Sequence, residues 1–203
     1  MIHASHMSSR NQFGSFLNNR GLLSLAVEIG THRGDYARIF LDTWKGAKLV
    51  CVDPWSIPEG YEAQAKILEE VWGSKTRGED YQSAVEKLKI HGLGTPEGRV
   101  VLFQGLSLDA VIEFEDESVD FVYVDGDHRY LEVHTDLRNW WYRLRKGGVL
   151  AGHDFICPGE VDGGWGRGIQ AAVFEFANDV VGTDVYLINE EGGLPWSYYM
   201  IKP

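Results

Sequence analysis

Carboxylates and imidazoles follow two short apolar runs of the chain, one ending at Val124 and the other at Ala151. These ionisable residues are Asp125, Asp127, His128, His153 and Asp154. The polar and aromatic segment between the two runs is long enough for one crossover helix, and parallel strands joined in this way end at the same edge of a sheet. Because burying charge is costly, charged groups rarely collect at strand ends for packing alone. The pattern therefore predicts a reaction centre at that edge.

The two halves of this cluster allow different interpretations. Asp127 and His128 could act as a general base, since imidazole titrates near neutral pH. Alternatively, Asp-Gly-Asp-His is good turn chemistry, and Asp127 would cap a helix that begins near Tyr130. For His153 and Asp154 a functional site is the better account, because a polar pair directly after a buried strand needs partners.

Strand-like runs alternate with helix-like patterns along the chain. The apolar runs lack strict alternation, as expected of strands buried on both faces, and lie at residues 24–29, 47–52, 100–103, 119–124 and 148–151. Helix-like patterns lie at residues 33–44, 79–91, 130–144 and 167–180. This alternation predicts an α/β, Rossmann-like, doubly wound and mostly parallel sheet. Two last runs, at 184–189 and 196–201, flank EEGGLP and predict a C-terminal antiparallel hairpin strand.

Composition limits the classes of partner. The 203 residues suffice for one buried core and do not require two domains. With 19 Lys and Arg against 30 Asp and Glu, the formal net charge is −11. An acidic chain without a basic run is a poor candidate for binding a phosphate backbone, so we expect a small-molecule substrate and no nucleic acid. Cys51 and Cys157 lack disulfide or metal spacing, and we expect both to pack as small apolar residues.

The ends and one insertion carry further expectations. No apolar run approaches the roughly 20 residues needed to cross a bilayer, and we expect a cytoplasmic protein without a membrane partner. Residues 1–10 contain HASHM, so we expect them to be disordered or vector-derived and leave them out of the fold reasoning. Residues 11–203 would then form one domain. The segment 56–78 is longer than a crossover requires and could be a lid or an extra surface helix.

The first predicted strand leads into a glycine-rich turn within residues 27–37, VEIGTHRGDYA. Gly30 and Gly34 would let the backbone approach a ligand near a helix N-terminus. The dinucleotide fingerprint G-x-G-x-x-G is not met, because the spacing here is G-x-x-x-G. The acid Glu28 suits a cationic ligand better than a pyrophosphate, and Asp53 could accept hydrogen bonds from both ribose hydroxyls. S-adenosylmethionine is a nucleoside with this positive character.

Four motifs, VEIGTHRGDYA, LVCVDPW, VDFVYVDGDHRY and GGVLAGHDF, occur in the order typical of class I S-adenosylmethionine-dependent methyltransferases. Over residues 24–180 the chain resembles this family, in particular the small-molecule O-methyltransferases related to the sugar O-methyltransferases of macrolide and aminocoumarin biosynthesis. The resemblance implies a seven-stranded sheet with an antiparallel last strand and methylation of a small-molecule or sugar hydroxyl. Two rivals are an NAD(P)-dependent oxidoreductase on a similar sheet, which Glu28 disfavours, and a non-catalytic S-adenosylmethionine-binding module.

The resemblance also implies a set of cofactor-binding residues. They are Glu28, Gly30, Thr31 and Gly34 on the methionine side, Asp53 at the ribose, Gln104 or the 105–107 turn with Ser107 at the adenine, and Asp125. Gln104 and the turn remain alternatives for the adenine.

For the acceptor side, the resemblance implies both a metal and a base. In metal-dependent relatives, carboxylates after the fourth and fifth strands bind a divalent cation, usually magnesium, and the matching positions here are Asp125, His153 and Asp154. Because magnesium favours oxygen ligands, the imidazole of His153 would suit manganese, iron or zinc better. Alternatively, no metal binds and His153 is itself a base. Asp127 matches the general base of the sugar-modifying relatives, and His128 could do the same task.

Overall fold

The computed structural model describes residues 1–56, 77–155, 166–191, 193 and 195–203. The strands are β1 (Ile2–Ala4), β2 (Leu25–Ile29), β3 (Lys48–Asp53), β4 (Val100–Gln104), β5 (Val119–Val124), β6 (Leu144–Gly152), β7 (Val185–Ile188) and β8 (Ser197–Ile201). The helices are α1 (Phe13–Asn19), α2 (Asp35–Thr43), α4 (Arg77–Leu88), α5 (Ser107–Val111), α6 (Tyr130–Arg143) and α7 (Gly166–Glu175). Shorter turns are η1 (Arg10–Gln12), η2 (Lys89–His91) and the π-helical η3 (Phe176–Val180). The segment predicted as a lid or an extra helix, apart from its ends, and Cys157 lie outside the described residues.

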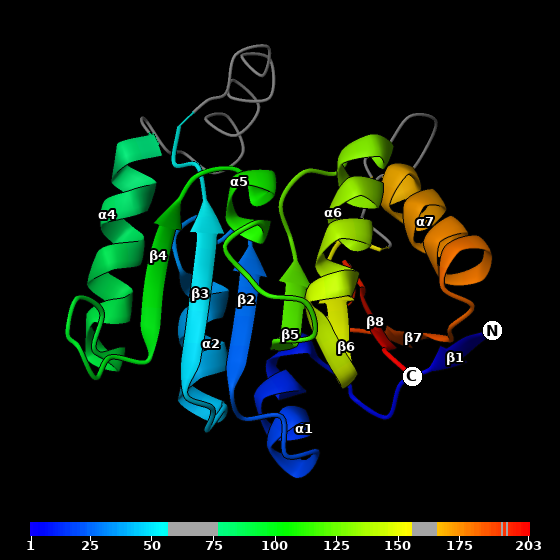
Figure 1. Cartoon of the computed structure of the whole chain (residues 1–203), viewed down its shortest axis with the longest axis horizontal. Coiled ribbons are helices and arrows are strands. Elements are labelled where there is room, and N and C mark those ends of the chain that lie inside the picture. Colours follow the sequence, from blue (N-terminus) through cyan, green and yellow to red (C-terminus); the bar gives the residue numbers. More distant parts are fainter. Residues whose placement is uncertain (57–76, 156–165, 192, 194) are drawn as a thin grey trace.

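The strands form one sheet in the order β1-β7-β8-β6-β5-β2-β3-β4 (Figure 1). The five strands from β2 to β6 are all parallel to one another. Strand β8 is antiparallel to both of its neighbours, β6 and β7. This confirms the predicted Rossmann-like α/β fold with a C-terminal antiparallel hairpin strand. Strand β2 lies between β3 and β5, so the chain leaves it in one direction and returns on its other side, which is where open α/β sheets bind ligands.

The sheet has eight strands where the resemblance implied seven. The additional strand β1 pairs in parallel with β7, with Ile2 opposite Val185 and Ala4 opposite Leu187. Of the two expectations for residues 1–10, disorder is therefore wrong, and a vector origin stays a prediction. The physical reason is that β7 would otherwise present an unpaired edge, and the main chain of this segment supplies the missing hydrogen bonds.

Each face of the sheet carries its own apolar cluster. Helices α5, α6 and α7 pack on one face against side chains such as Val27 and Val122, whereas α1, α2 and α4 pack on the other against Ala26 and Phe121. Neighbouring residues of one strand thus belong to opposite clusters, as the two-residue period of a strand requires. Because both faces are covered, the strands read as continuous apolar runs, and this is why their positions could be predicted.

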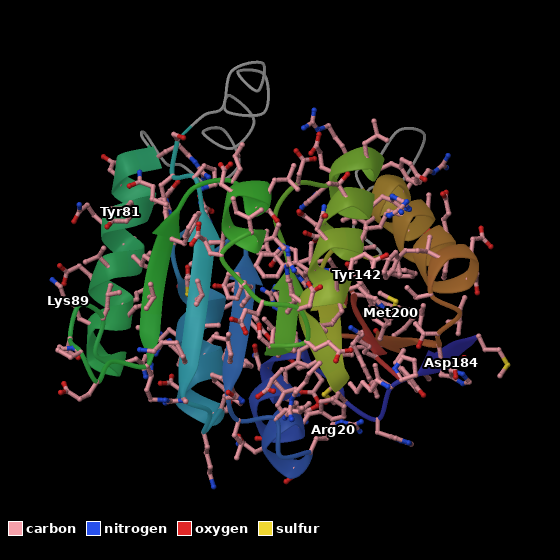
Figure 2. The ribbon with its side chains drawn as sticks, in the orientation of Figure 1. Arg20, Tyr81, Lys89, Tyr142, Asp184 and Met200 are labelled. Carbon is pink, nitrogen blue, oxygen red and sulfur yellow. The ribbon has the colours of Figure 1, made fainter. Side chains whose placement is uncertain are left out.

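The helices follow the same division between buried and exposed sides. On α6, Trp140 and Trp141 are buried, as expected for sheet packing, whereas the next residue, Tyr142, is 60% exposed. Met200 of β8 is fully buried, and both labelled side chains can be followed in Figure 2. Cys51 is also fully buried, as predicted. Among the described residues, no helix combines the length and apolar character that crossing a membrane requires.

Helix α1 was not predicted, yet it supplies a large core side chain. Phe13 is fully buried, with its ring centroid 5.2 Å from that of Phe121 and 5.9 Å from those of Tyr123 and Tyr199. We expect Phe13→Ala to lower the free energy of unfolding by about 3–5 kcal/mol in urea titrations, since it leaves a cavity. The control Leu131→Ala removes a side chain that is 71% exposed and should change stability by less than about 0.5 kcal/mol. Equal midpoints for the two variants would contradict the packing of α1.

Candidate functional site

The turn after β2 lies tightly against the turn after β5. Gly30 has φ of 86°, and a Cβ atom there would lie 2.2 Å from the carbonyl oxygen of Asp125. Gly34 has φ of 74°, and its Cβ would lie 3.1 Å from Cα of Ala84 on α4. Glycine is therefore required at both positions by the packing of the chain on itself, where the sequence had suggested room for a ligand.

Glu28 is a buried acid at the end of β2. Its side chain is opposite Cys51 and Tyr123 in the register of the sheet, and the residue is only 3% exposed. The hydroxyl of Thr31 donates a 2.9 Å hydrogen bond to Oε2 of Glu28. Burial raises the pKa of Glu28 to about 8, a rise that this hydrogen bond opposes and the nearby charge of Asp125 reinforces. Glu28 is thus mostly protonated at neutral pH.

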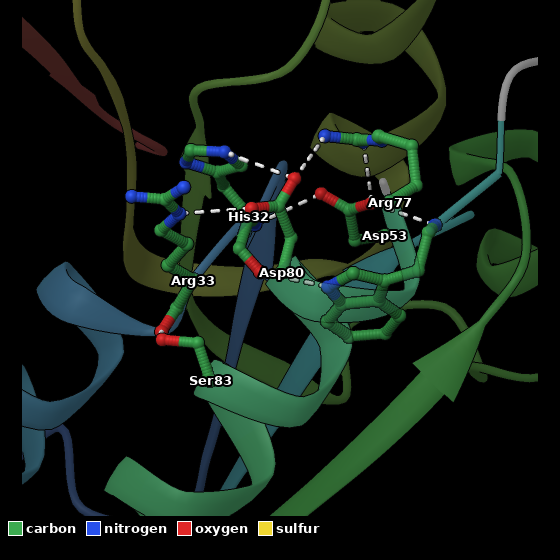
Figure 3. A network of polar contacts seen from close by, with 7 residues as sticks. His32, Arg33, Asp53, Arg77, Asp80 and Ser83 are labelled. Carbon is green, nitrogen blue, oxygen red and sulfur yellow. Dashed lines mark hydrogen bonds and ion pairs between the residues drawn. The ribbon is translucent and has the colours of Figure 1, made fainter. Parts of the chain in front are cut away.

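Asp53, at the end of β3, is buried and accepts three hydrogen bonds (Figure 3). Its Oδ1 accepts from the main-chain N–H of Trp55 at 2.8 Å and from Nη2 of Arg77 at 3.0 Å. Its Oδ2 accepts from the main-chain N–H of His32 at 2.9 Å. A carboxylate offers about four lone-pair positions, so the described contacts leave one on Oδ2 for a further donor.

A second buried carboxylate, Asp80 of α4, ties the same region together (Figure 3). Nε of Arg33 donates to it at 2.8 Å, while Arg77 and His32 approach it at 3.4 Å. Arg77 therefore bridges Asp53 and Asp80. The bridge connects the start of α4 to the turns after β2 and β3, which fixes the direction in which Asp53 points.

An acid and imidazole cluster lies at the ends of β5 and β6. The potential metal-binding atoms of Asp125, His128 and Asp154 lie within 4.8 Å of one another. Nε2 of His128 is 3.1 Å from Oδ2 of Asp154. Burial alone would lower the pKa of His128, but its hydrogen bond to Asp154 and the surrounding carboxylates outweigh it and raise the pKa above the ordinary value. Burial and the neighbouring Asp154 raise the pKa of Asp125, against the effect of Arg10.

His153 has other partners than the two carboxylates. Its Nδ1 is 2.9 Å from Oγ of Ser197, whose hydroxyl donates to Oε1 of Glu190 at 2.7 Å. Because the hydroxyl has one proton and a carboxylate only accepts, Nδ1 of His153 must donate to Ser197, which leaves the lone pair on Nε2. Burial, together with the charge of Arg10, lowers the pKa of His153 to about 4.

The metal ligands that the resemblance implies, Asp125, His153 and Asp154, stay a prediction. In the structure Asp125 and Asp154 lie close together, and the imidazole beside them is that of His128. The reason is that Ser197 on β8 holds the His153 ring, whereas the turn after β5 directs His128 toward Asp154. Both imidazoles line the same small pocket, together with Val124, Gly126, Val133, Ile169 and Tyr198.

The remaining predicted residues lie at the same edge with different partners. Asp127 accepts a 2.7 Å hydrogen bond from the main-chain N–H of Arg129 and pairs with its guanidinium, which is a turn role. It does not cap α6, because the N-cap of that helix is Arg129 and has no side-chain cap. Ser107 accepts a 2.8 Å hydrogen bond from Nε1 of Trp140, so its hydroxyl is directed at α6. Gln104 is exposed at the end of β4. Of the two adenine alternatives, Gln104 is thus the side chain more accessible to a ligand.

Comparison with known proteins agrees with this layout. Residues 27–155 match the protein family described as “Methyltransferase domain”. The chain belongs to this family. Two solved structures have a similar fold: an O-methyltransferase from Bacillus cereus in complex with SAH, at 17% identity and a TM-score of 0.63 over 98% of this chain and 84% of that one, and an SAH-bound methyltransferase from Podospora anserina, at 19% identity and a TM-score of 0.63 over 97% and 80%.

A curated relative of this methyltransferase domain is longer than the chain. It is an uncharacterized protein of Acanthamoeba polyphaga mimivirus, 23% identical over 154 residues. The match covers 76% of the chain and 59% of the viral protein. At these identities, the two solved structures support the shared fold, and the family assignment rests on the matched residues of the domain.

The methyltransferase domain contains site residues that the sequence reasoning missed. Arg10 lies within the segment that was set aside, and its guanidinium donates to Asp125 at 3.1 Å. Arg77 borders the long insertion. It begins the run Arg-Gly-Glu-Asp, whose acids in the first turn are typical of a helix start and could have pointed to it. Glu190 follows β7 and Ser197 begins β8 within the terminal hairpin, and nothing in their local sequence separates them from ordinary hairpin residues.

Backbone strain also collects at this edge of the methyltransferase domain. His32, Trp55 and Asp154, which follow β2, β3 and β6, have φ of 51°, 42° and 54°. The left-handed region is unfavourable for residues other than glycine and costs about 1–3 kcal/mol each. Such strain persists only where the surrounding contacts hold it, as the hydrogen bonds of Asp53 do for His32 and Trp55.

We expect Glu28→Gln to flatten the dependence of stability on pH between about 4.5 and 8. The folded protein keeps the proton of Glu28, whose pKa is raised from 4.5 to about 8, while the unfolded chain releases it in this range. The stabilisation is therefore complete at low pH and is lost as the pH rises through the folded pKa, by about 1.4 kcal/mol per unit of pKa difference. The free energy of unfolding of the wild type and of Glu28→Gln, measured by urea titration at several pH values in this range, tests this expectation. The other buried acids remain in both, so parallel curves would contradict the role of Glu28.

Proposed function

We propose that this methyltransferase domain transfers a methyl group from S-adenosylmethionine to a hydroxyl of a small molecule or sugar. The observation that carries the proposal is the row of acids at the carboxyl ends of three adjacent parallel strands: Glu28 on β2, Asp53 on β3 and Asp125 after β5. A cationic nucleoside suits such an edge better than a pyrophosphate does. The SAH in the two structurally similar proteins supports the same choice.

The residues at this edge fit the parts of the cofactor. Asp53 would hold the ribose hydroxyls, and Gln104 would border the adenine. The turn from Gly30 to Gly34, with Glu28 and Thr31, would line the methionine part. When bound, S-adenosylmethionine supplies an electrophilic methyl group on a sulfonium. Asp53 and Asp125 would supply negative charge near the sulfonium, whereas Glu28, which keeps its proton at neutral pH, would contribute only hydrogen bonds.

His128 is our proposed general base. A base works best when its pKa lies near the working pH, and the contact with Asp154 keeps the pKa of His128 above its ordinary value. The acceptor oxygen would displace sulfur at the methyl carbon and release S-adenosylhomocysteine, while the hydroxyl proton moves to His128. Asp154 would stabilise the imidazolium that forms. His153 would orient the acceptor hydroxyl through Nε2. Asp127, held by Arg129, is less suited to the base role.

The cluster of Asp125, His128 and Asp154 also fits a divalent cation, with ligand atoms at most 4.8 Å apart. Two carboxylates and an imidazole suit manganese, iron or zinc better than magnesium, and such an ion would polarise the acceptor oxygen. His128 cannot be both a metal ligand and the general base. A metal would need the lone pair of Nε2, whereas the base role keeps Nε2 in contact with Asp154. We favour the base, because Arg10 already pairs with Asp125 and Nε2 of His128 already contacts Asp154.

Binding of S-adenosylhomocysteine, measured by isothermal titration, tests the cofactor. We expect binding of this product, no binding of NAD, and a loss of about tenfold or more in affinity for Asp53→Asn, because charged hydrogen bonds contribute about 1.5–3 kcal/mol. The control Asp42→Asn changes an exposed acid of α2 and should bind like the wild type. Binding of NAD alone would overturn the proposal, and binding without any methyl transfer would favour a non-catalytic module.

Transfer of labelled methyl groups to a panel of sugars and phenols tests the base. His128→Gln should lower turnover by about 10²–10⁴-fold while S-adenosylhomocysteine still binds. We expect wild-type turnover to persist in a chelator. Loss of turnover that manganese restores, together with manganese binding that Asp154→Asn abolishes in a calorimeter, would show instead that the cluster binds a cation.

A further inference from the structure

Arg10 reaches the candidate site from the N-terminal segment. Its main-chain N–H donates to both carboxylate oxygens of Glu190, at 2.9 and 3.0 Å. Two residues earlier, Ser8 accepts a main-chain hydrogen bond from Glu191 at 2.8 Å and donates its hydroxyl to the Glu191 carboxylate at 2.6 Å. Ser9 accepts from the main-chain N–H of Asn11 and caps the short η1 turn. The position of Arg10 is thus held by four contacts with the residues that follow β7 and by a local cap.

The guanidinium of Arg10 uses only part of its donor capacity. A single nitrogen, Nη1, contacts Oδ2 of Asp125 at 3.1 Å and the hydroxyl of Tyr123 at 3.4 Å. The charged group lies 5.1 Å from the ring centroid of Tyr36, which holds the planar group from one side. Among the described residues, Nε and Nη2 of Arg10 donate to no acceptor, and the side chain is 29% exposed. The outer edge of the guanidinium is therefore available to a ligand.

The geometry of that edge indicates the chemistry of the ligand. Arginine presents two parallel N–H groups, which match the two oxygens of a carboxylate. Beside it lie acceptors for a cation: Asp125, in direct contact, and Glu28, which neighbours Tyr123 in the sheet. A donor pair next to carboxyl groups is complementary to the carboxylate and ammonium of a free amino acid. The guanidinium of Arg10 and these carboxyl groups lie on the side of the site that begins at the turn after β2.

We propose that Arg10 binds the carboxylate of the amino-acid part of S-adenosylmethionine. This inference rests on the proposed cofactor and adds a residue from outside the matched domain region, which spans 27–155. The N-terminal segment then completes the cofactor site in addition to closing the edge of the sheet. Asp125 holds the guanidinium in place and would face the ammonium group.

Two ligands that differ only in the amino-acid part test the assignment by calorimetry. S-adenosylhomocysteine contains this part, and 5′-methylthioadenosine lacks it. For Arg10→Gln we expect the affinity for S-adenosylhomocysteine to fall about 10- to 100-fold and that for 5′-methylthioadenosine to change less than about twofold. Arg10→Lys should recover part of the loss, because it keeps the charge without the fork. The control Arg20→Gln removes an arginine that contacts the Phe16 ring and should bind both ligands like the wild type.

Each other outcome separates the two proposals. Equal losses for both ligands in Arg10→Gln would assign Arg10 a structural role in the N-terminal segment and overturn the inference. Unchanged affinity for S-adenosylhomocysteine, with a raised KM for the acceptor, would also overturn it and assign the guanidinium to an anionic acceptor. Failure of the wild type to bind either ligand would reject the proposed cofactor itself, whatever Arg10 does.

Discussion

The close approach of two turns is the constraint on which the site depends. The turn after β2 meets the turn after β5 where Gly30 leaves no room for a side chain, and the main-chain N–H of Asp125 donates to Ile29 at 2.8 Å. This contact brings Glu28 of β2 close to Asp125, which follows β5, the neighbouring strand in the sheet. A larger residue at position 30 would separate the two turns and with them the cofactor side from the acceptor side. The glycine therefore acts through the geometry of the backbone.

Carboxyl groups gathered in this way must be neutralised or paired, because a buried charge without a partner is costly. The structure uses a different means at each position. Glu28 keeps its proton, Asp53 accepts two main-chain N–H groups and Arg77, and Asp125 pairs with Arg10. Two of these partners come from the N-terminal segment and from the start of α4. Segments that are remote in sequence must therefore meet at the carboxyl edge of the sheet, because their arginines pair with its carboxylates.

Much of this could be predicted from the sequence, and the limits have physical causes. Strands buried on both faces are continuous apolar runs, so their ends, and hence the positions of Asp53 and Asp125, could be predicted. Helices α1 and α5 were missed because seven and five residues show too little periodicity. Arg10 was missed because its role depends on contacts with residues about 115 and 180 positions away. The sequence could not show that His128 rather than His153 contacts Asp154. That contact depends on the direction in which each imidazole ring points, and residue spacing does not determine it.

The left-handed residues at the strand ends have a consequence for how this protein could be altered. At Asp154, glycine would adopt the same φ without steric cost, so selection for thermal stability alone would favour glycine there. At Trp55 glycine would instead be destabilising, because the ring is buried and packs against Tyr81. The replacement at Asp154 would remove the carboxylate that contacts His128. Relief of backbone strain and preservation of the proposed chemistry are therefore opposing demands at this position.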